Sequence, residues 1–363
     1  MQPPSGMGLE QMLAEALRHH RAGQLADAER LYRAILSIDS RHAESLHLLG
    51  VIAHQTGRND VAAGLIATAI DIDGTVARYH VHLGVALKGL RRFDAAMAAY
   101  HAAIRIEPPF AEAHYNLGNA LKDQQRLDEA AASYERALAL KPDFAAALIN
   151  LGLTLLACGK EERSLDCALQ VLKIEENDKA KELFVRSLGS LQSPPAVRHG
   201  GQVRSFLLRA LSEPWARPSQ LVPACIGVIK RDPVILAAIE CAQNSPGEPA
   251  GDEFSAGGPL GVTLSDPLPI ALLKAAPVTD TGFESLLCRA RRALLAFAQS
   301  ARGGTPDMPG LLAFYVALAQ QCFINEYVFA LADDELAHAR DLWEALAAAL
   351  DSDVAFLRSG LSR

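Results

Sequence analysis

Residues 111–143 read AEAHYNLGNALKDQQRLDEAAASYERALALKPD, and the same pattern returns every 34 residues through the first half of the chain. The copy that begins at Ala77 reads ARYHVHLGVALKGLRRFDAAMAAYHAAIRIEPP, and no residue is inserted between neighbouring copies. A fixed period of this length is typical of repeat proteins, in which each unit is one supersecondary element. We therefore expect five units in 9–178, at 9–42, 43–76, 77–110, 111–144 and 145–178.

Small and large residues recur at fixed positions, counted from the first residue of each unit. Position 8 is Gly in four units and position 20 is Ala in four units, while positions 4, 7, 11 and 24 are mostly large. Small residues let two antiparallel helices approach closely, and the large ones fill the space between them. A single helix pair cannot cover its own apolar face, whereas a stack of five pairs can. The pattern therefore predicts an all-α stack of helix pairs.

Composition agrees with this fold and narrows the class of partner. Half of the 363 residues are apolar but only 6% are aromatic, which favours close-packed Ala- and Leu-rich helices over a β-sandwich or barrel. The formal net charge is −7. A negative balance argues against a nucleic-acid backbone or an anionic membrane surface as the main partner. We expect neither a nucleic acid nor a membrane among the partners.

The repeat resembles the tetratricopeptide repeat (TPR) family. The resemblance rests on the Leu-Gly pairs at positions 7 and 8, the alanines at position 20, the tyrosines at position 24, and Pro108 and Pro142 at position 32. It implies a right-handed superhelix, an α-solenoid, whose concave face is lined by the first helix of each pair and binds peptides or other proteins. The apolar face of residues 179–192 predicts a helix that caps the last pair, and residues 1–8 are expected to be a disordered N-terminus.

Groove-facing side chains in such stacks fall near positions 2, 5, 6, 9, 12 and 13 of each first helix. We expect the peptide-binding groove to present His47, His54, Arg78, His82, Lys88, Glu112, Tyr115, Asn116, Asn119, Lys122 and Asn150. Asparagine can hold a peptide backbone, and lysine can meet carboxylates. Asn116 and Asn150 at position 6 also resemble the asparagine ladder of O-linked N-acetylglucosamine transferases. The alternative is a polar face that serves only solubility.

The second half of the chain loses the 34-residue register. Residues 193–270 are rich in Pro and Gly and predict a linker with short helices, and residues 271–363 predict a C-terminal helical domain. Residues 266–345, above all FYVALAQQCFINEYVF (314–329), resemble the helical segment that precedes the methyltransferase domain in bacterial TPR–methyltransferase proteins. No nucleotide-binding pattern of strand, Gly-rich loop and helix follows it, so the catalytic domain is expected to be absent.

Motifs that carry chemistry are missing from the sequence. It contains no HExxH, P-loop, GxSxG or GxGxxG, so we expect no enzyme activity, no cofactor and no metal site. The six cysteines are scattered and form no CxxC pair, which favours free thiols in a reducing compartment. The N-terminus lacks a signal-peptide pattern, and the longest apolar stretch, 311–331, contains polar residues that would be costly in a bilayer. We expect a cytoplasmic protein.

These patterns together predict a non-catalytic scaffold that binds a protein or peptide in the concave groove. Two alternatives from other classes stay open. The chain could recruit substrate for, or regulate, a methyltransferase that depends on S-adenosylmethionine and whose catalytic domain is not in this chain. A weaker alternative is an adaptor for protein O-glycosylation, which rests on the style of the repeats alone.

Overall fold

The computed structural model describes residues 8–191, 200–213, 215–244, 263, 266–276, 278–300 and 317, with 291–300 described by their backbone alone. Every regular element in these residues is a helix. The chain divides into two compact units, Met1–Ser187 and Leu188–Arg363. Each unit is described by itself below.

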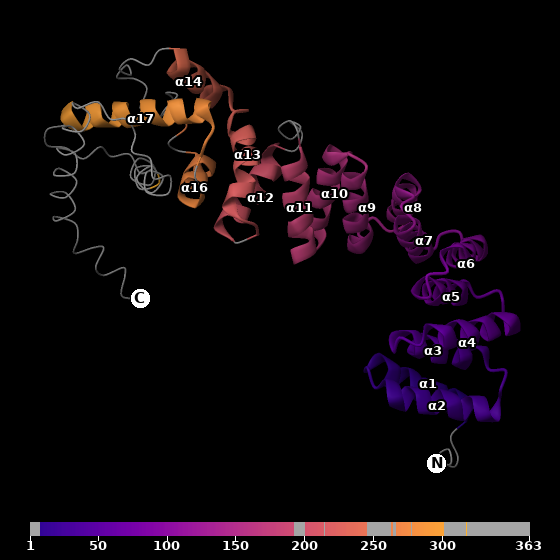
Figure 1. Cartoon of the computed structure of the whole chain (residues 1–363). Helices are drawn as coiled ribbons and strands as arrows, with labels where there is room; N and C mark the ends of the chain where they lie inside the picture. The colour runs from indigo at the N-terminus through magenta and orange to yellow at the C-terminus, as the bar shows by residue number, and fades with distance from the viewer. Residues whose placement is uncertain are drawn as a thin grey trace, which may run out of the picture. The chain divides into compact units, whose positions relative to one another are not determined.

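The first unit is a stack of five helix pairs, which follow one another in chain order (Figure 1). The first helices of the pairs are α1 (Leu9–Arg21), α3 (Ala43–Gln55), α5 (Ala77–Gly89), α7 (Ala111–Asp123) and α9 (Ala145–Ala157). The second helices are α2 (Leu25–Ile38), α4 (Asn59–Ile72), α6 (Phe93–Ile106), α8 (Leu127–Leu140) and α10 (Glu161–Ile174). Each first helix begins 34 residues after the preceding one, so the structural period equals the sequence period, and the predicted α-solenoid is confirmed.

The first helices form the inner side of the solenoid. Helix α3 contacts α5, α5 contacts α7, and α7 contacts α9, whereas consecutive second helices make fewer contacts within residues 8–191. In a curved stack, the elements on the inner side approach one another most closely. The side chains at positions 2, 5, 6, 9, 12 and 13 of the first helices are therefore called the inner face.

Close packing within a pair explains the glycine at position 8. A Cβ atom on Gly84 would lie 2.4 Å from Cε1 of Tyr100, and one on Gly118 would lie 2.7 Å from Cε1 of Tyr134. Both tyrosine rings are fully buried and have no room to move aside. In the third and fourth units, the tyrosine at position 24 thus leaves no room for a side chain at position 8, whereas the first unit combines Ala16 with a buried Tyr32.

Helix α11 (Asp178–Ser190) follows the last pair and covers it. Position 24 of the fifth unit is the small residue Ala168, and a Cβ on Gly152 would instead lie 2.6 Å from Cδ2 of Leu183 on α11. Leu183 and Phe184 are fully buried, and Ser187 Oγ forms a buried 2.8 Å hydrogen bond with Ser164 Oγ of α10. Helix α11 therefore fills the space that a large position-24 side chain fills in the other units.

The turn within each pair requires a left-handed residue at position 15. Gly23, Gly57 and Gly159 meet this need with φ between 66° and 79°. Arg91 and Gln125 stand at the same position in the third and fourth units, with φ of 59° and 61°. Residues with a side chain are disfavoured there by about 1–2 kcal/mol, so these two turns carry backbone strain that the other three avoid.

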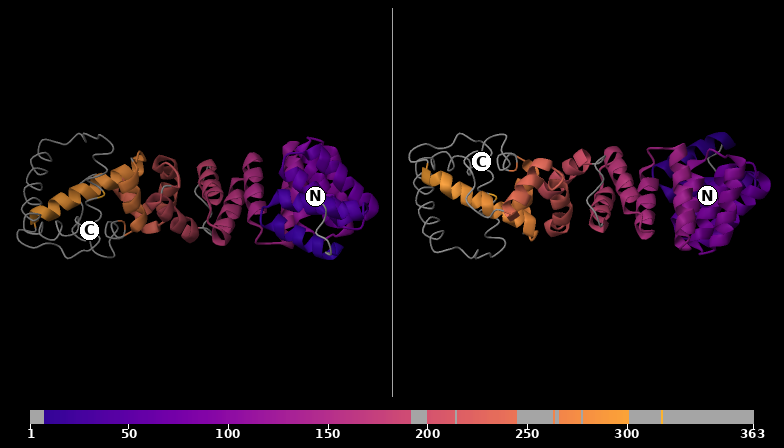
Figure 2. Two further views of the ribbon diagram at one scale, coloured as in Figure 1. Left: turned by 90° about the horizontal axis from the view of Figure 1, so that it is seen from below. Right: turned by 90° about the horizontal axis from the view of Figure 1, so that it is seen from above.

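The second unit contains helices of less uniform length, from 9 residues in α16 to 20 in α17. Its described helices are α12 (Gly200–Ser212), α13 (Pro218–Ile229), α14 (Pro233–Asn244), α16 (Pro267–Ala275) and α17 (Thr281–Ser300). Helix α16 packs on α12 and α13, and α14 packs on α17, which is one continuous helix, orange in Figure 2. Ion pairs join Arg204 to Asp266 and Lys230 to Asp280.

The structure describes only part of the residues that the sequence expectations for the second half concern. Helices α12, α13 and α14 fall within the predicted linker of residues 193–270. Apart from Ala317, the string at 314–329 that resembles TPR–methyltransferase proteins lies outside the described residues. The rest of the predicted C-terminal helical domain beyond residue 300 also lies outside them. Among the described helices, none combines the length and the apolar character that crossing a bilayer requires.

Candidate functional site

All eleven side chains that the sequence predicted for a groove stand on the first helices at inner-face positions, because the inner face is defined by the same positions. Helix α3 supplies two of them, α5 three, α7 five and α9 one: His47 and His54; Arg78, His82 and Lys88; Glu112, Tyr115, Asn116, Asn119 and Lys122; and Asn150. Several of them meet a residue 35 positions away, which is the next position in the neighbouring unit. These contacts link neighbouring first helices directly and decide which polar groups are already satisfied.

A carboxylate joins α3 to α5 at one end of the inner face. Glu44 Oε2 forms a 2.6 Å ion pair with Arg78 Nη2 and accepts a 2.9 Å hydrogen bond from the hydroxyl of Tyr79. The guanidinium of Arg78 also lies 5.7 Å from the centre of the Tyr79 ring. Burial, reinforced by the hydrogen bond to Glu44, raises the pKa of Tyr79 to about 12. Arg78 is therefore committed to a contact within the solenoid.

Two histidines form a stacked pair between the same helices. Nε2 of His47 lies 2.6 Å from Nδ1 of His82, and the two rings are nearly parallel, with centres 4.8 Å apart. His47 is 1% exposed, and its Nδ1 atom has no hydrogen-bond partner within the described residues. Burial, with nearby positive groups, lowers the pKa of His47 to about 3 and also lowers that of His82. The pair is neutral at pH 7, and its two residues stand at inner-face positions 5 and 6.

Two of the predicted asparagines are bound to each other. Asn119 Oδ1 accepts a 2.8 Å hydrogen bond from the Tyr134 hydroxyl and a 2.9 Å hydrogen bond from Asn150 Nδ2. Asn150 Nδ2 also lies 3.2 Å from the hydroxyl of Tyr115, whose ring packs on Phe144. This network joins α7, α8 and α9. The side chain of Asn150 is therefore engaged, whereas the Nδ2 group of Asn119 keeps free hydrogen-bonding capacity.

The side chains of three predicted residues on α7 have no hydrogen bond or ion pair within residues 8–191. Glu112 is exposed, and Asn116 and Lys122 are half-buried. By contrast, Lys88 on α5 forms a 3.3 Å ion pair with Asp123, and His54 Nδ1 lies 2.6 Å from Asn59 Oδ1. The free hydrogen-bonding and charged groups of the predicted set are thus concentrated on α7.

One buried hydroxyl was not foreseen from the sequence. Tyr100 is fully buried, and its hydroxyl has no partner among the described residues, whereas Tyr134 reaches Asn119 and the Tyr32 hydroxyl lies 3.5 Å from His20 Nδ1. Burial raises the pKa of Tyr100 far above its usual value. The repeat alignment could have indicated the missing partner, because position 9 is Val85 in the third unit and Asn119, the partner of Tyr134, in the fourth.

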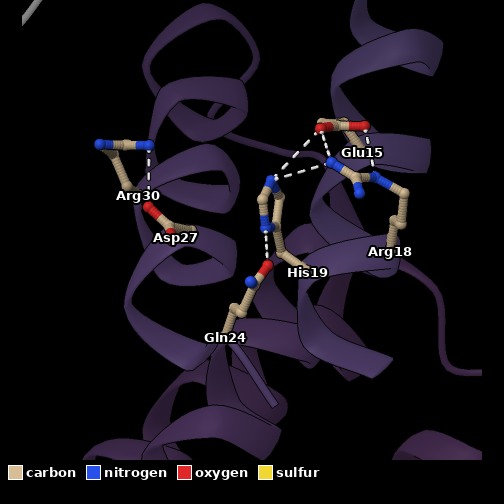
Figure 3. Close-up of polar contacts among 6 residues, drawn as sticks. All are labelled: Glu15, Arg18, His19, Gln24, Asp27 and Arg30. Atoms are coloured by element: carbon tan, nitrogen blue, oxygen red, sulfur yellow. Dashed lines mark hydrogen bonds and ion pairs between the residues drawn. The ribbon is translucent and has the colours of Figure 1, made fainter. Parts of the chain in front are cut away.

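A further set of polar contacts in the first pair joins residues outside the inner-face positions (Figure 3). His19 lies between Glu15 on the same helix and Gln24 at the start of α2, with 3.2 Å and 2.5 Å separations, and Arg18 also pairs with Glu15. Asp27 and Arg30 form a separate ion pair on α2. None of these residues occupies an inner-face position, and their contacts lie within the first helix pair.

The site offers hydrogen bonds and charges rather than reactive groups. The described residues contain no group of three side chains suited to hold a metal ion. Burial raises the pKa of the Cys167 and Cys225 thiols to about 12, which suppresses thiolate chemistry at neutral pH. The arrangement fits recognition of a polar, peptide-like ligand.

Comparisons with known proteins match the repeat region. A family model described as a TPR repeat matches residues 92–125 and 118–159, and one described as a tetratricopeptide repeat matches residues 13–77. No curated protein sequence matches the chain.

Solved structures resemble this chain over about half of its length. MamA is 25% identical over 44% of this chain and 93% of its own, with a TM-score of 0.41. YrrB, described as a TPR protein with an unusual peptide-binding site, is 20% identical over 48% and 91%, with a TM-score of 0.40. The pilF protein of Pseudomonas aeruginosa is 16% identical over 57% and 93%, with a TM-score of 0.49.

Proposed function

From the tetratricopeptide repeats of residues 13–77 and 92–159, we propose that this protein is a non-catalytic scaffold that binds a protein or peptide on its inner face. The observation that carries the proposal is the concentration of free hydrogen-bonding and charged groups on α7. No hydrogen-bond or ion-pair partner within the solenoid meets the side chains of Asn116 and Lys122 or the Nδ2 group of Asn119. Most of the surrounding polar side chains have such a partner.

The chemistry of these groups suits an extended peptide. The carboxamide of Asn116 offers both a donor and an acceptor, which matches the alternating N–H and C=O groups of a peptide backbone. The ammonium of Lys122 offers a positive charge for an acidic side chain or a terminal carboxylate. A surface that served only solubility would need none of these groups to be half-buried on the inner side of the stack.

The catalytic and cellular assignments follow the same proposal. Burial raises the pKa of the Cys167 and Cys225 thiols, which favours a scaffold over an enzyme that uses either thiol as a nucleophile. A cytoplasmic location is part of the same proposal and rests on the scattered cysteines of the sequence. The roles with a methyltransferase module or in protein O-glycosylation stay predictions, because no described residue bears on them.

Affinity capture with matched variants tests the proposal. We expect the double variant Asn116→Ala, Lys122→Ala to lose most of the partner that the full-length protein captures from extracts of its source cells. Asn119 is left intact because its replacement would also unpair Tyr134 and Asn150. The control is Arg105→Ala, Arg136→Ala, at exposed positions on α6 and α8. Equal loss of the partner from both double variants, or from neither, would overturn the proposal.

A further inference from the structure

Most polar contacts between neighbouring first helices follow one geometric rule, from which Glu44–Arg78 and Asn119–Asn150 depart. A side chain at one position meets the next position in the following unit, 35 residues later. Position 2 meets position 3 at Glu44 and Tyr79, and position 5 meets position 6 at His47 and His82. Position 5 meets position 6 again at Tyr115 and Asn150, and position 12 meets position 13 at His20 and Gln55 and at Lys88 and Asp123.

The same rule explains why the side chains of Glu112, Asn116 and Lys122 on α7 are left without partners. Lys122 stands at position 12, and the residue that would meet it at position 13 of the fifth unit is Ala157. Glu112 stands at position 2, and the fifth unit offers Ala146 and Ala147 where the third offers Arg78 and Tyr79.

Asn116 lacks its partner on the other side of α7. It stands at position 6, and the residue that would meet it at position 5 of the third unit is Val81. Alanine and valine side chains offer no hydrogen bond and no charge. The polar contacts between neighbouring first helices are therefore missing at Glu112, Asn116 and Lys122, although Lys88–Asp123 and Asn119–Asn150 still join α7 to α5 and α9.

On the basis of the proposed function, we infer that α7 binds an extended peptide with a basic side chain beside Glu112 and an acidic side chain beside Lys122. These two residues are separated by ten positions on one helix, which corresponds to about 15 Å. An extended chain rises about 3.3 Å per residue, so the two charges on the ligand are about four to five residues apart. Asn116 and Asn119 Nδ2 lie between them and hydrogen-bond the ligand backbone.

The charge pattern excludes ligands of a single sign. An all-acidic peptide would pair with Lys122 but place a carboxylate beside Glu112, and an all-basic peptide would meet the reverse conflict. Charge complementarity suppresses wrong partners chiefly through such like-charge contacts. The net negative charge of the chain does not decide the partner, because the unpaired groups on α7 are one acid, one base and two amides.

Peptides of defined charge test this inference directly. The probes are three fluorescent peptides of about nine residues, built from Ala, Asn and Ser, with blocked ends and two charged residues about five positions apart. One probe carries Lys and Asp, one carries two Asp and one carries two Lys. We expect the full-length protein to bind the mixed probe about fivefold more tightly than either probe of one sign. The direction in which a peptide lies along α7 is not specified by the inference. The probe set therefore varies the charges and does not include a peptide with Lys and Asp exchanged.

Single charge reversals should change the preferred probe in opposite directions. Glu112→Lys should favour the probe with two Asp, and Lys122→Glu should favour the probe with two Lys. The matched controls make the same charge changes at exposed sites away from the inner face, with Glu107→Lys and Arg105→Glu, and should keep the preference for the mixed probe.

Two results would overturn the inference: no preference of the unaltered protein for the mixed probe, or shifts in the control variants as large as those in the α7 variants. The partner-capture experiment separates this failure from failure of the proposed function. Loss of the natural partner from the Asn116→Ala, Lys122→Ala variant, combined with no probe preference, would leave the scaffold function standing and the charge pattern wrong.

Discussion

The buried histidine pair links the stability of the second and third repeats to pH. Lowering the pH from about 7 to about 5 protonates histidine in the unfolded chain, whose ordinary pKa is 6.5, but not His47 in the folded chain, where burial lowers its pKa to about 3. A group with a depressed folded pKa stabilises the protein above its unfolded pKa, and that stability is lost as the pH falls toward the folded pKa. The loss therefore begins near pH 6.5.

The size of the effect follows from the difference between the two pKa values. At about pH 5 the unfolded chain is stabilised by protonation by about 2 kcal/mol for this one residue, against about 0.2 kcal/mol at pH 7. His82 adds to the loss because its pKa is also lowered, chiefly by burial and then by Arg78 and His54, with Glu44 opposing them. Between about pH 7 and about pH 5, the free energy of opening helices α3 to α6 should thus fall by about 2 kcal/mol or more.

Hydrogen exchange followed by mass spectrometry measures this locally in the full-length protein, because peptides from α3 and α5 report their own opening free energy. The variant His47→Leu removes the titrating group and should flatten the pH dependence of these peptides, although its stability at pH 7 is also changed. The control is His101→Leu, at an exposed position on α6, which should keep the full dependence. An opening free energy that falls equally in the unaltered protein and in His47→Leu would refute the reasoning.

Three further substitutions test the packing and the turns. Gly84→Ala should destabilise the third repeat by about 1–3 kcal/mol, because the new Cβ would lie 2.4 Å from the buried Tyr100 ring. Gly64→Ala, where a Cβ meets nothing within 4 Å, should instead stabilise α4 by about 0.5–1 kcal/mol. Arg91→Gly should stabilise its turn by roughly 0.5–1 kcal/mol, because relief of the left-handed strain outweighs the entropy that glycine gains in the unfolded chain. Denaturant unfolding of the full-length variants checks all three, and a destabilised Arg91→Gly or a neutral Gly84→Ala would contradict the account.

The repeat part of the fold could be predicted from the sequence because its period is unbroken. The spacing between Gly84 and Tyr100 recurs between Gly118 and Tyr134, and it predicts that the two helices of a pair pack closely. The strained turns could not be foreseen in the same way. Arg91 and Gln125 adopt the left-handed conformation only because the surrounding helix pair imposes it, and their residue types favour other conformations.

The candidate site was predictable in its location but not in its pairing. Helical position alone assigns all eleven residues to the first helices. It does not distinguish Asn150, which is bound to Asn119, from Asn116, which is unbound, because that difference depends on which residue stands 35 positions away. The sequence does contain Tyr115 opposite Asn150 and Val81 opposite Asn116, but the contact rule that gives those pairs their meaning required the structure.

Site-specific photo-crosslinking tests the central claim most directly. A photoreactive phenylalanine analogue would replace Ala157, an exposed residue at inner-face position 13 of α9, or Ala132, an exposed residue on the second helix α8. If ligands bind along α7 on the inner face, the captured partner should form adducts with the analogue at position 157 and not with that at position 132. Adducts only at position 132, or equally at both positions, would contradict binding on the inner face.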